Sequence, residues 1–234
     1  MKKILILGIL LSFVIFAIRW LNRNISYQLF GEIYTSIETD QKVVALTLDD
    51  GPNEKIDTIL SILNHHNVKA TFFPIGNLMA NRLSDVKRMV RDGHEIGNHS
   101  FTHQALSFKS YETIDQEIEP TDRLIRQAGY KGVIHFRPPY GKKLFMLPLY
   151  LEQHNRKTIT WNIAPEGNRM LNNDPDKLAQ HVIDQARNGS IILLHPMNDG
   201  NEASLNSLDF MIRGLKEKGF KFKSVTELLA LNKK

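Results

Sequence analysis

The feature that most constrains the fold is a regular alternation of short apolar runs and longer amphipathic runs, which starts near residue 42. The short runs predict strands, and the longer ones carry apolar residues at helical spacing. The predicted strands are Val43–Leu48, Thr71–Ile75, Glu95–Asn98, Val133–Phe136, Thr158–Trp161, Ser190–Leu194 and Phe220–Lys223. The predicted helices are 56–66, 78–92, 110–128, 144–154, 175–188, 204–218 and 225–231. This alternation predicts an α/β fold of parallel strands, either a doubly wound sheet or, as we favour, a distorted or incomplete (β/α) barrel of about seven strands.

The first 23 residues do not follow this alternation. They contain the uncharged run ILILGILLSFVIFAI, residues 4–18, which is typical of a secretion signal or a membrane anchor. No small-x-small cleavage site follows it, so an uncleaved anchor is predicted, and a cleaved, secreted form is the alternative. Lys2 and Lys3 would hold the N-terminus in the cytoplasm and place the rest outside. The predicted division is an anchor at 1–23, a connector at 24–40 and a globular domain at 41–234.

Composition excludes several classes of protein. Hydrophobic residues make up 42% and charged residues 24%, as in a packed domain rather than a disordered chain. The formal charge is +5, but the basic residues are scattered and no nucleic-acid-binding motif accompanies them, so no nucleic-acid partner is predicted. The chain has no cysteine, which excludes disulfides, thiolate nucleophiles and cysteine-ligated metals.

Ionisable residues follow four of the predicted strands. Asp49 and Asp50 follow the first, HSFTH (residues 99–103) follows the third, RPPYG (residues 137–141) follows the fourth, and His195 follows the sixth. The carboxyl ends of parallel strands meet on one face, where α/β proteins place their sites. The sequence therefore predicts a single site at this face, although Asp-Asp-Gly is also ordinary turn chemistry.

The two histidines of HSFTH predict a metal site. His99 and His103 are four residues apart, so in one helical turn both imidazoles would point the same way. A carboxylate from Asp50 would complete a set of two imidazoles and one carboxylate with open positions, as in catalytic zinc sites. The same set occurs at non-haem Fe(II) centres, so the residues leave the metal open.

The remaining residues at this face suit acid–base catalysis. With Asp50 on the metal, Asp49 could take a proton from water, its ionised form favoured by Arg137. His195 could protonate a leaving group, although a hydrogen-bonded core histidine is the alternative. The two prolines of RPPYG restrict that loop enough to present a backbone N–H to an oxyanion.

These residues, in this order, closely resemble the NodB-homology polysaccharide deacetylases of carbohydrate esterase family 4. TLDDG, HSFTH, RPPYG and LLH match four family motifs, and ATFF at 70–73 and the closing GFKFKSVTELL are also similar. The resemblance covers about residues 42–231. It implies a distorted barrel and metal-dependent removal of N-acetyl groups from the amino sugars of a polymer such as peptidoglycan, a chitin-like polymer or poly-N-acetylglucosamine.

The resemblance also implies a role for each matched residue. Asp49 is the base, Arg137 orients it, and His195 is the acid. Asp50, His99 and His103 bind one divalent ion, expected to be zinc, with cobalt, nickel, manganese and iron as alternatives. Tyr140 donates its backbone N–H, and the residues expected to contact the sugar are Pro138, Tyr140, Trp161 and Leu193.

One motif departs from the family. Where the family often has Trp-x-x-Asp-x-x-Asp-Trp, with an aspartate that tunes the acid histidine, this chain has WNIAPEGN at residues 161–168. Trp161 matches, but the aspartate positions hold Ala164 and Gly167, and Glu166 lies one residue early. Without a carboxylate partner His195 would be less readily protonated near neutral pH. The departure puts the rate, pH optimum and substrate in question more than the reaction class.

The prediction is a monomeric, membrane-anchored hydrolase of N-acetylated glycans that faces the periplasm or the extracellular space. One alternative is an O-acetyl esterase or a sugar deformylase on the same metal. The other is a catalytically weak glycan-binding protein of the envelope.

Overall fold

A parallel sheet of five strands forms the centre of the molecule. The computed structural model describes residues 2–168, 170–171 and 173–233. The sheet has the order β4-β3-β2-β6, and β7 pairs with the start of β2. Its strands are β2 (Val43–Asp49), β3 (Thr71–Phe73), β4 (Glu95–Ile96), β6 (Ser190–Leu194) and β7 (Lys221–Phe222). All of these pairs are parallel, which confirms the predicted α/β class with parallel strands.

A second, two-stranded sheet lies beside the first. It pairs β1 (Ile33–Tyr34) with β5 (Thr158–Ile159), also in parallel. Phe136 forms single-residue bridges to Asn98 and to β5, and Ile163 bridges to β6. These bridges connect the two sheets into a distorted ring. In the segment 133–136, which was predicted to be a strand, only Phe136 forms bridges to its neighbours. The start of the segment lies on the surface, since Val133 is exposed.

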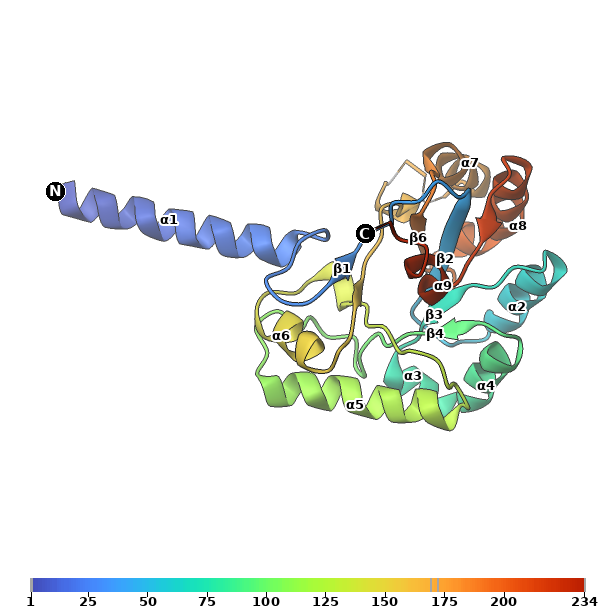
Figure 1. The fold of residues 1–234 in the computed structure, drawn as a ribbon, viewed down its shortest axis with the longest axis horizontal. Coiled ribbons are helices and arrows are strands. Elements are labelled where there is room, and N and C mark those ends of the chain that lie inside the picture. The colour runs from blue at the N-terminus through green and yellow to red at the C-terminus, as the bar shows by residue number, and fades with distance from the viewer. Residues whose placement is uncertain (1, 169, 172, 234) are drawn as a thin grey trace.

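Helices surround the larger sheet (Figure 1). They are α2 (Ile56–His65), α3 (Gly76–Asn81), α4 (Leu83–Arg91), α5 (Tyr111–Gln127), α6 (Met146–Gln153), α7 (Pro175–Gln185), α8 (Glu202–Glu217) and α9 (Val225–Leu229). The helix predicted at 78–92 is instead two helices. Arg82, with φ −136° and ψ 39°, interrupts the helical backbone, and its Nε donates to Asp85 in the first turn of α4 at 2.6 Å.

Strand β2 is buried along its whole length, as its apolar sequence predicts. Val44, Leu46 and Leu48 belong to the large core cluster shared with the surrounding helices. Val43 and Ala45 belong to a smaller cluster on the opposite side, which includes β6 residue Ile191. Because side chains alternate along a strand, Asp49 lies on the same side as Val43 and Ala45.

Helix α1 (Lys2–Arg23) extends away from the rest of the molecule (Figure 1). Its segment Ile6–Arg23 is long and apolar enough to cross a membrane, and none of it is buried. Residues 24–40, predicted as a connector, lie along the domain. They contribute β1 and the 5%-exposed Ile37 to it.

Candidate active site

A pocket of about 520 Å³ opens at the carboxyl ends of β2 and β6. Its size is in the range of small-molecule sites. Its lining includes nine of the predicted site residues, namely Asp49, Asp50, His99, His103, Pro138, Tyr140, Trp161, Leu193 and His195. The tenth, Arg137, is fully buried and reaches the pocket through Asp49.

The two aspartates at the end of β2 face the same histidine. Asp49 Oδ2 lies 3.6 Å and Asp50 Oδ1 lies 3.7 Å from Nε2 of His99. Adjacent residues of an extended strand would point to opposite sides, but Asp50 has φ +68°. The left-handed backbone at Asp50 turns the chain just after the strand ends. Both carboxylates therefore enter one pocket.

Asp49 is held by a buried arginine. Arg137 is 0% exposed, and its Nη1 donates to Asp49 Oδ1 at 2.5 Å and to Thr47 Oγ1 at 2.7 Å. Its other nitrogens donate to the backbone oxygens of Ile159 and Thr160. A buried charge requires partners of this kind, since an unpaired one is costly. The guanidinium thus fixes one oxygen of Asp49 and leaves the other facing the pocket.

The two histidines converge without a helix. Residues 99–103 form a loop in which Ser100 and His103 have positive φ, so the predicted helical turn is wrong. The His103 N–H donates to Ser100 Oγ at 3.0 Å. Buried Glu117 accepts from the backbone N–H groups of Phe101 and Thr102. The backbone N–H groups of this loop are therefore paired with side-chain oxygens rather than with the carbonyl groups of a helix. In this conformation both imidazoles point into the pocket.

The ligand atoms suit a divalent metal ion. Atoms of Asp50, His99 and His103 all lie within 4.8 Å of one another, and Asp50 Oδ1 is 3.4 Å from His103 Nε2. Bonds of about 2.0–2.1 Å at tetrahedral angles would place ligand atoms about 3.3 Å apart. Asp50 Oδ1 is buried without a hydrogen-bond partner among the described residues, as expected of an oxygen reserved for a cation.

The protonation of both histidines also fits a metal. His99 Nδ1 lies 2.7 Å from the Arg137 carbonyl oxygen. It can only donate there, which leaves the Nε2 lone pair facing the ligand set. Burial, together with the neighbouring His99, lowers the pKa of His103 and favours its neutral, ligating form. The three predicted ligands therefore fit the predicted group.

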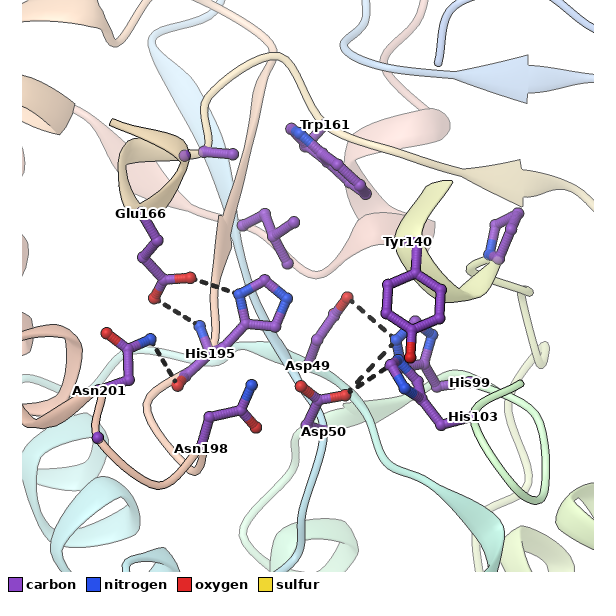
Figure 2. Close-up of a pocket in the computed structure, with 15 residues that line it drawn as sticks. Asp49, Asp50, His99, His103, Tyr140, Trp161, Glu166, His195, Asn198 and Asn201 are labelled. Atoms are coloured by element: carbon purple, nitrogen blue, oxygen red, sulfur yellow. Dashed lines mark hydrogen bonds and ion pairs between the residues drawn. The ribbon is translucent and has the colours of Figure 1, made fainter. Parts of the chain in front are cut away.

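On the opposite side of the pocket, Glu166 holds His195 (Figure 2). One carboxylate oxygen contacts His195 Nδ1, and the other accepts from the His195 backbone N–H at 2.8 Å. Burial acts to lower the pKa of His195, but the Glu166 hydrogen bond and the charge of Asp49 outweigh it and raise this pKa to about 9. Glu166 is thus the carboxylate partner that the altered 161–168 segment left in question.

Tyr140 is the most exposed residue of the RPPYG loop, at 61%. Its φ of +59°, next to Gly141 at +64°, gives this turn a left-handed backbone. The Tyr140 ring centroid lies 4.8 Å from that of His103. Its backbone N–H donates to no other residue in the described part of the chain, so it is available to a bound ligand.

The sequence did not identify several pocket residues near His195. The additional lining residues are Ala164, Glu166, Gly167, Asn198, Gly200 and Asn201. The sequence drew attention to the segment that holds the first three, but not to the last three. Asn201 Nδ2 donates to the His195 carbonyl oxygen at 3.1 Å. These residues belong to turns, and the only signal for them was their nearness in sequence to Trp161 and His195.

The sequence is similar to those of known proteins. A family model described as polysaccharide deacetylase matches residues 36–167. The chain is 34% identical over 200 residues to the bifunctional xylanase/deacetylase of Pseudobutyrivibrio xylanivorans, across 82% of this chain but only 31% of that protein. It is 32% identical over 194 residues to the peptidoglycan-N-acetylmuramic acid deacetylase PdaA of Bacillus subtilis, across 82% of this chain and 73% of the relative.

A solved structure is similar as well. BA3943 from Bacillus anthracis, described as a CE4 family pseudoenzyme, has a TM-score of 0.77 and 33% identity over 87% of this chain and 70% of that one. A mutant of BA3943 described as having restored enzymatic activity gives the same TM-score. Because the family model matches more than half of the sequence, the chain belongs to the polysaccharide deacetylase family, carbohydrate esterase family 4.

Proposed function

We propose that this protein removes N-acetyl groups from the amino sugars of a glycan. One observation carries the proposal: an arginine-held Asp49 beside three metal-ligand side chains faces a glutamate-held His195 across one pocket. The arrangement places a base and an acid on opposite sides of a space that a substrate can enter. Amide hydrolysis needs both, because water must lose a proton and the departing nitrogen must gain one.

The base side activates the water. Asp50, His99 and His103 would hold a divalent ion, for which we propose zinc, and when bound it would act as a Lewis acid and lower the pKa of water. Asp49 accepts the proton of the water that attacks the acetamide carbonyl carbon. Arg137 fixes the orientation of Asp49 during this transfer, because it donates a hydrogen bond to Asp49 Oδ1.

The acid side completes the reaction. The backbone N–H of Tyr140 donates to the oxygen on which negative charge develops. His195, protonated because its pKa is about 9, gives a proton to the sugar nitrogen as the carbon–nitrogen bond breaks. Acetate and the free amino sugar are the products. Pro138, Tyr140, Trp161 and Leu193 line the pocket and would contact the sugar.

We further propose peptidoglycan as the first substrate to test, since relatives bear the names of peptidoglycan deacetylases. We also propose that α1 anchors a monomeric domain outside the cytoplasm, because its apolar segment is unburied and long enough to span. The likeness to BA3943 supports a second candidate, a glycan-binding protein without turnover. The intact set of base, ligand and acid side chains favours catalysis.

The test is acetate release from N-acetylglucosamine oligomers and from peptidoglycan. Release should stop when a chelator removes the metal and return when zinc is restored. Release that chelators leave unchanged would contradict the metal-dependent mechanism. Glycan binding without acetate release, under metal-loaded conditions, would instead support the second candidate.

A further inference from the structure

The end of α1 is attached directly to the globular domain. Asn22 Oδ1 accepts a hydrogen bond from Ser107, and the Asn24 carbonyl oxygen accepts one from Lys143 Nζ at 2.5 Å. Lys143 is 1% exposed, and burial lowers its pKa to about 8. The Asn24 carbonyl oxygen is its one hydrogen-bond acceptor in the described part of the chain. A buried amine with this one acceptor ties the residue after α1 to the domain.

The next residue, Ile25, supports the wall of the pocket. Its carbonyl oxygen accepts from Thr160 Oγ1 at 2.7 Å, next to Trp161. Its Cγ2 lies 3.1 Å from where a Cβ on Gly141 would be, so it packs behind the loop that carries Tyr140. Ile25 lies two positions beyond Arg23, the last residue of α1, a distance of at most about 7 Å. No flexible linker therefore lies between α1 and the pocket wall.

Three exposed aromatic side chains lie within two residues, along the sequence, of Ile25, Ser107 and Lys143, which make this attachment. Tyr27, Phe108 and Phe145 are 46%, 74% and 46% exposed. The Tyr27 ring lies 5.8 Å from that of Trp20 at the end of α1, and the Phe145 ring lies 5.1 Å from that of Phe30. Phe108 follows Ser107, the residue bound to Asn22. We call Trp20, Tyr27, Phe108 and Phe145 the aromatic face.

Both the helix and the aromatic face suit one lipid surface. The 22 residues of α1 would be about 33 Å long, enough to cross a bilayer's hydrocarbon core of about 30 Å with the last turn at its edge. Arg19, Trp20 and Arg23 would then lie at headgroup level, where tryptophan, tyrosine and the ends of arginine side chains are favoured. The aromatic face is continuous with that level through the contact of Tyr27 with Trp20.

We propose that the aromatic face rests on the membrane that α1 spans, and that the pocket acts on N-acetylated glycan held at that membrane surface, such as glycan carried on a lipid. This inference rests on the proposed deacetylase function and on the proposed anchor. A domain of about 200 residues is roughly 40 Å across. Because its attachment to α1 is direct, the pocket stays within that distance of the headgroups and does not reach distant polymer.

The first test measures contact with lipid without using activity. The full chain is reconstituted in vesicles with Phe108→Cys as the only cysteine, which a fluorescent dye then labels. The matched control, Lys131→Cys, places the dye at an exposed site past the other end of α5, about 25 Å away. Nitroxide lipids should quench the dye at 108 several-fold more than the dye at 131. Equal quenching at both positions would overturn the proposed orientation.

The second test measures the consequence for catalysis. About twelve Gly and Ser residues, spanning roughly 19 Å, are inserted between Leu21 and Asn22, so that the attachment of the domain to α1 is lost. The control has the same insertion after Lys131. We expect the first insertion to lower acetate release from lipid-carried glycan at least about 5-fold, with release from the same glycan in solution unchanged. An unchanged rate on the lipid-carried glycan would overturn the inference.

The two tests separate this inference from the proposed function. If the uninserted enzyme releases no acetate from either glycan, the deacetylase function fails while dye quenching still decides the orientation. If acetate is released from both glycans but neither quenching nor the insertion has its expected effect, the function stands and the membrane-surface substrate is wrong.

Discussion

The two sides of the pocket are built differently. On the metal side, the ligands come from two short motifs, and nearby groups such as Ser100 and Glu117 support the loop that carries both histidines. On the acid side, His195 depends on Glu166, 29 residues away in a separate turn. A compact motif can be recognised from sequence, whereas a partner supplied by a distant turn is identified only once the chain is folded.

The largest expected effect on kcat/KM comes from replacing Asp49, the proposed base. Asp49→Asn should lower kcat/KM by about 1000-fold, because general-base catalysis contributes about 100- to 10,000-fold. Metal content should stay at the wild-type level, since Asp49 lies outside the ligand set. Asp57→Asn, on the exposed side of α2, is the charge-matched control. Full activity in Asp49→Asn would exclude its role as the base.

Replacing a proposed metal ligand should weaken metal binding and leave the His195 side of the pocket unchanged. His103→Ala is expected to weaken metal binding more than about 100-fold, since loss of an outer-shell partner alone costs about 10- to 100-fold. Competition with a chelator measures this affinity, and exposed His65→Ala is the control. Stoichiometric binding at wild-type affinity would show that His103 is not a ligand.

Removing the charge of Glu166 should lower the pKa of His195 and leave the metal side of the pocket unchanged. His195 has to be protonated to act, so activity should fall as the pH rises through its pKa, which is about 9. A bound metal ion would offset the charges of Asp49 and Asp50 but leave the hydrogen bond that His195 donates to Glu166. In Glu166→Gln the alkaline limb of kcat/KM should therefore move down by about one pH unit, with about a 2-fold loss at pH 8 that approaches 10-fold near pH 10.

The metal affinity of Glu166→Gln should match that of the wild-type protein, because Glu166 lies across the pocket from the ligands. Glu166→Asp keeps the charge on a shorter side chain and should restore part of the alkaline limb. An unchanged pH profile in Glu166→Gln would contradict the positioning role of Glu166.

The smallest expected effect concerns Asn201, which donates only a neutral hydrogen bond to the His195 carbonyl oxygen. Such a bond contributes about 1 kcal/mol, so Asn201→Ala should lower kcat/KM by at most about 5-fold. The alkaline limb should not move, because the charge near the imidazole is unchanged. A shift as large as that of Glu166→Gln would mean that the turn, rather than the carboxylate charge, tunes His195.

The order and type of most helices and strands could be predicted from the sequence, but not all of their boundaries. The apolar run of β2 and the helix α5 occur where their patterns placed them. The strand at 133–136 and the helix at 78–92 were wrong in extent, because tertiary contacts end them: Phe136 alone reaches its neighbours, and Arg82 interrupts the backbone. Local sequence patterns indicate which residues are buried, but they do not show where a strand or helix ends, because contacts with distant segments decide that.

For the site, the sequence by itself identified most of the side chains that line the pocket, because strand ends in a parallel α/β fold converge on one face. Only the tertiary structure decided how they converge. A left-handed backbone at Asp50 turns the chain after the strand, and a loop with a left-handed His103 replaces the helical turn that the histidine spacing suggested. Tertiary structure also decided that Glu166 meets His195, since this hydrogen bond joins two separate segments that are brought together only when the sheet and its turns have formed.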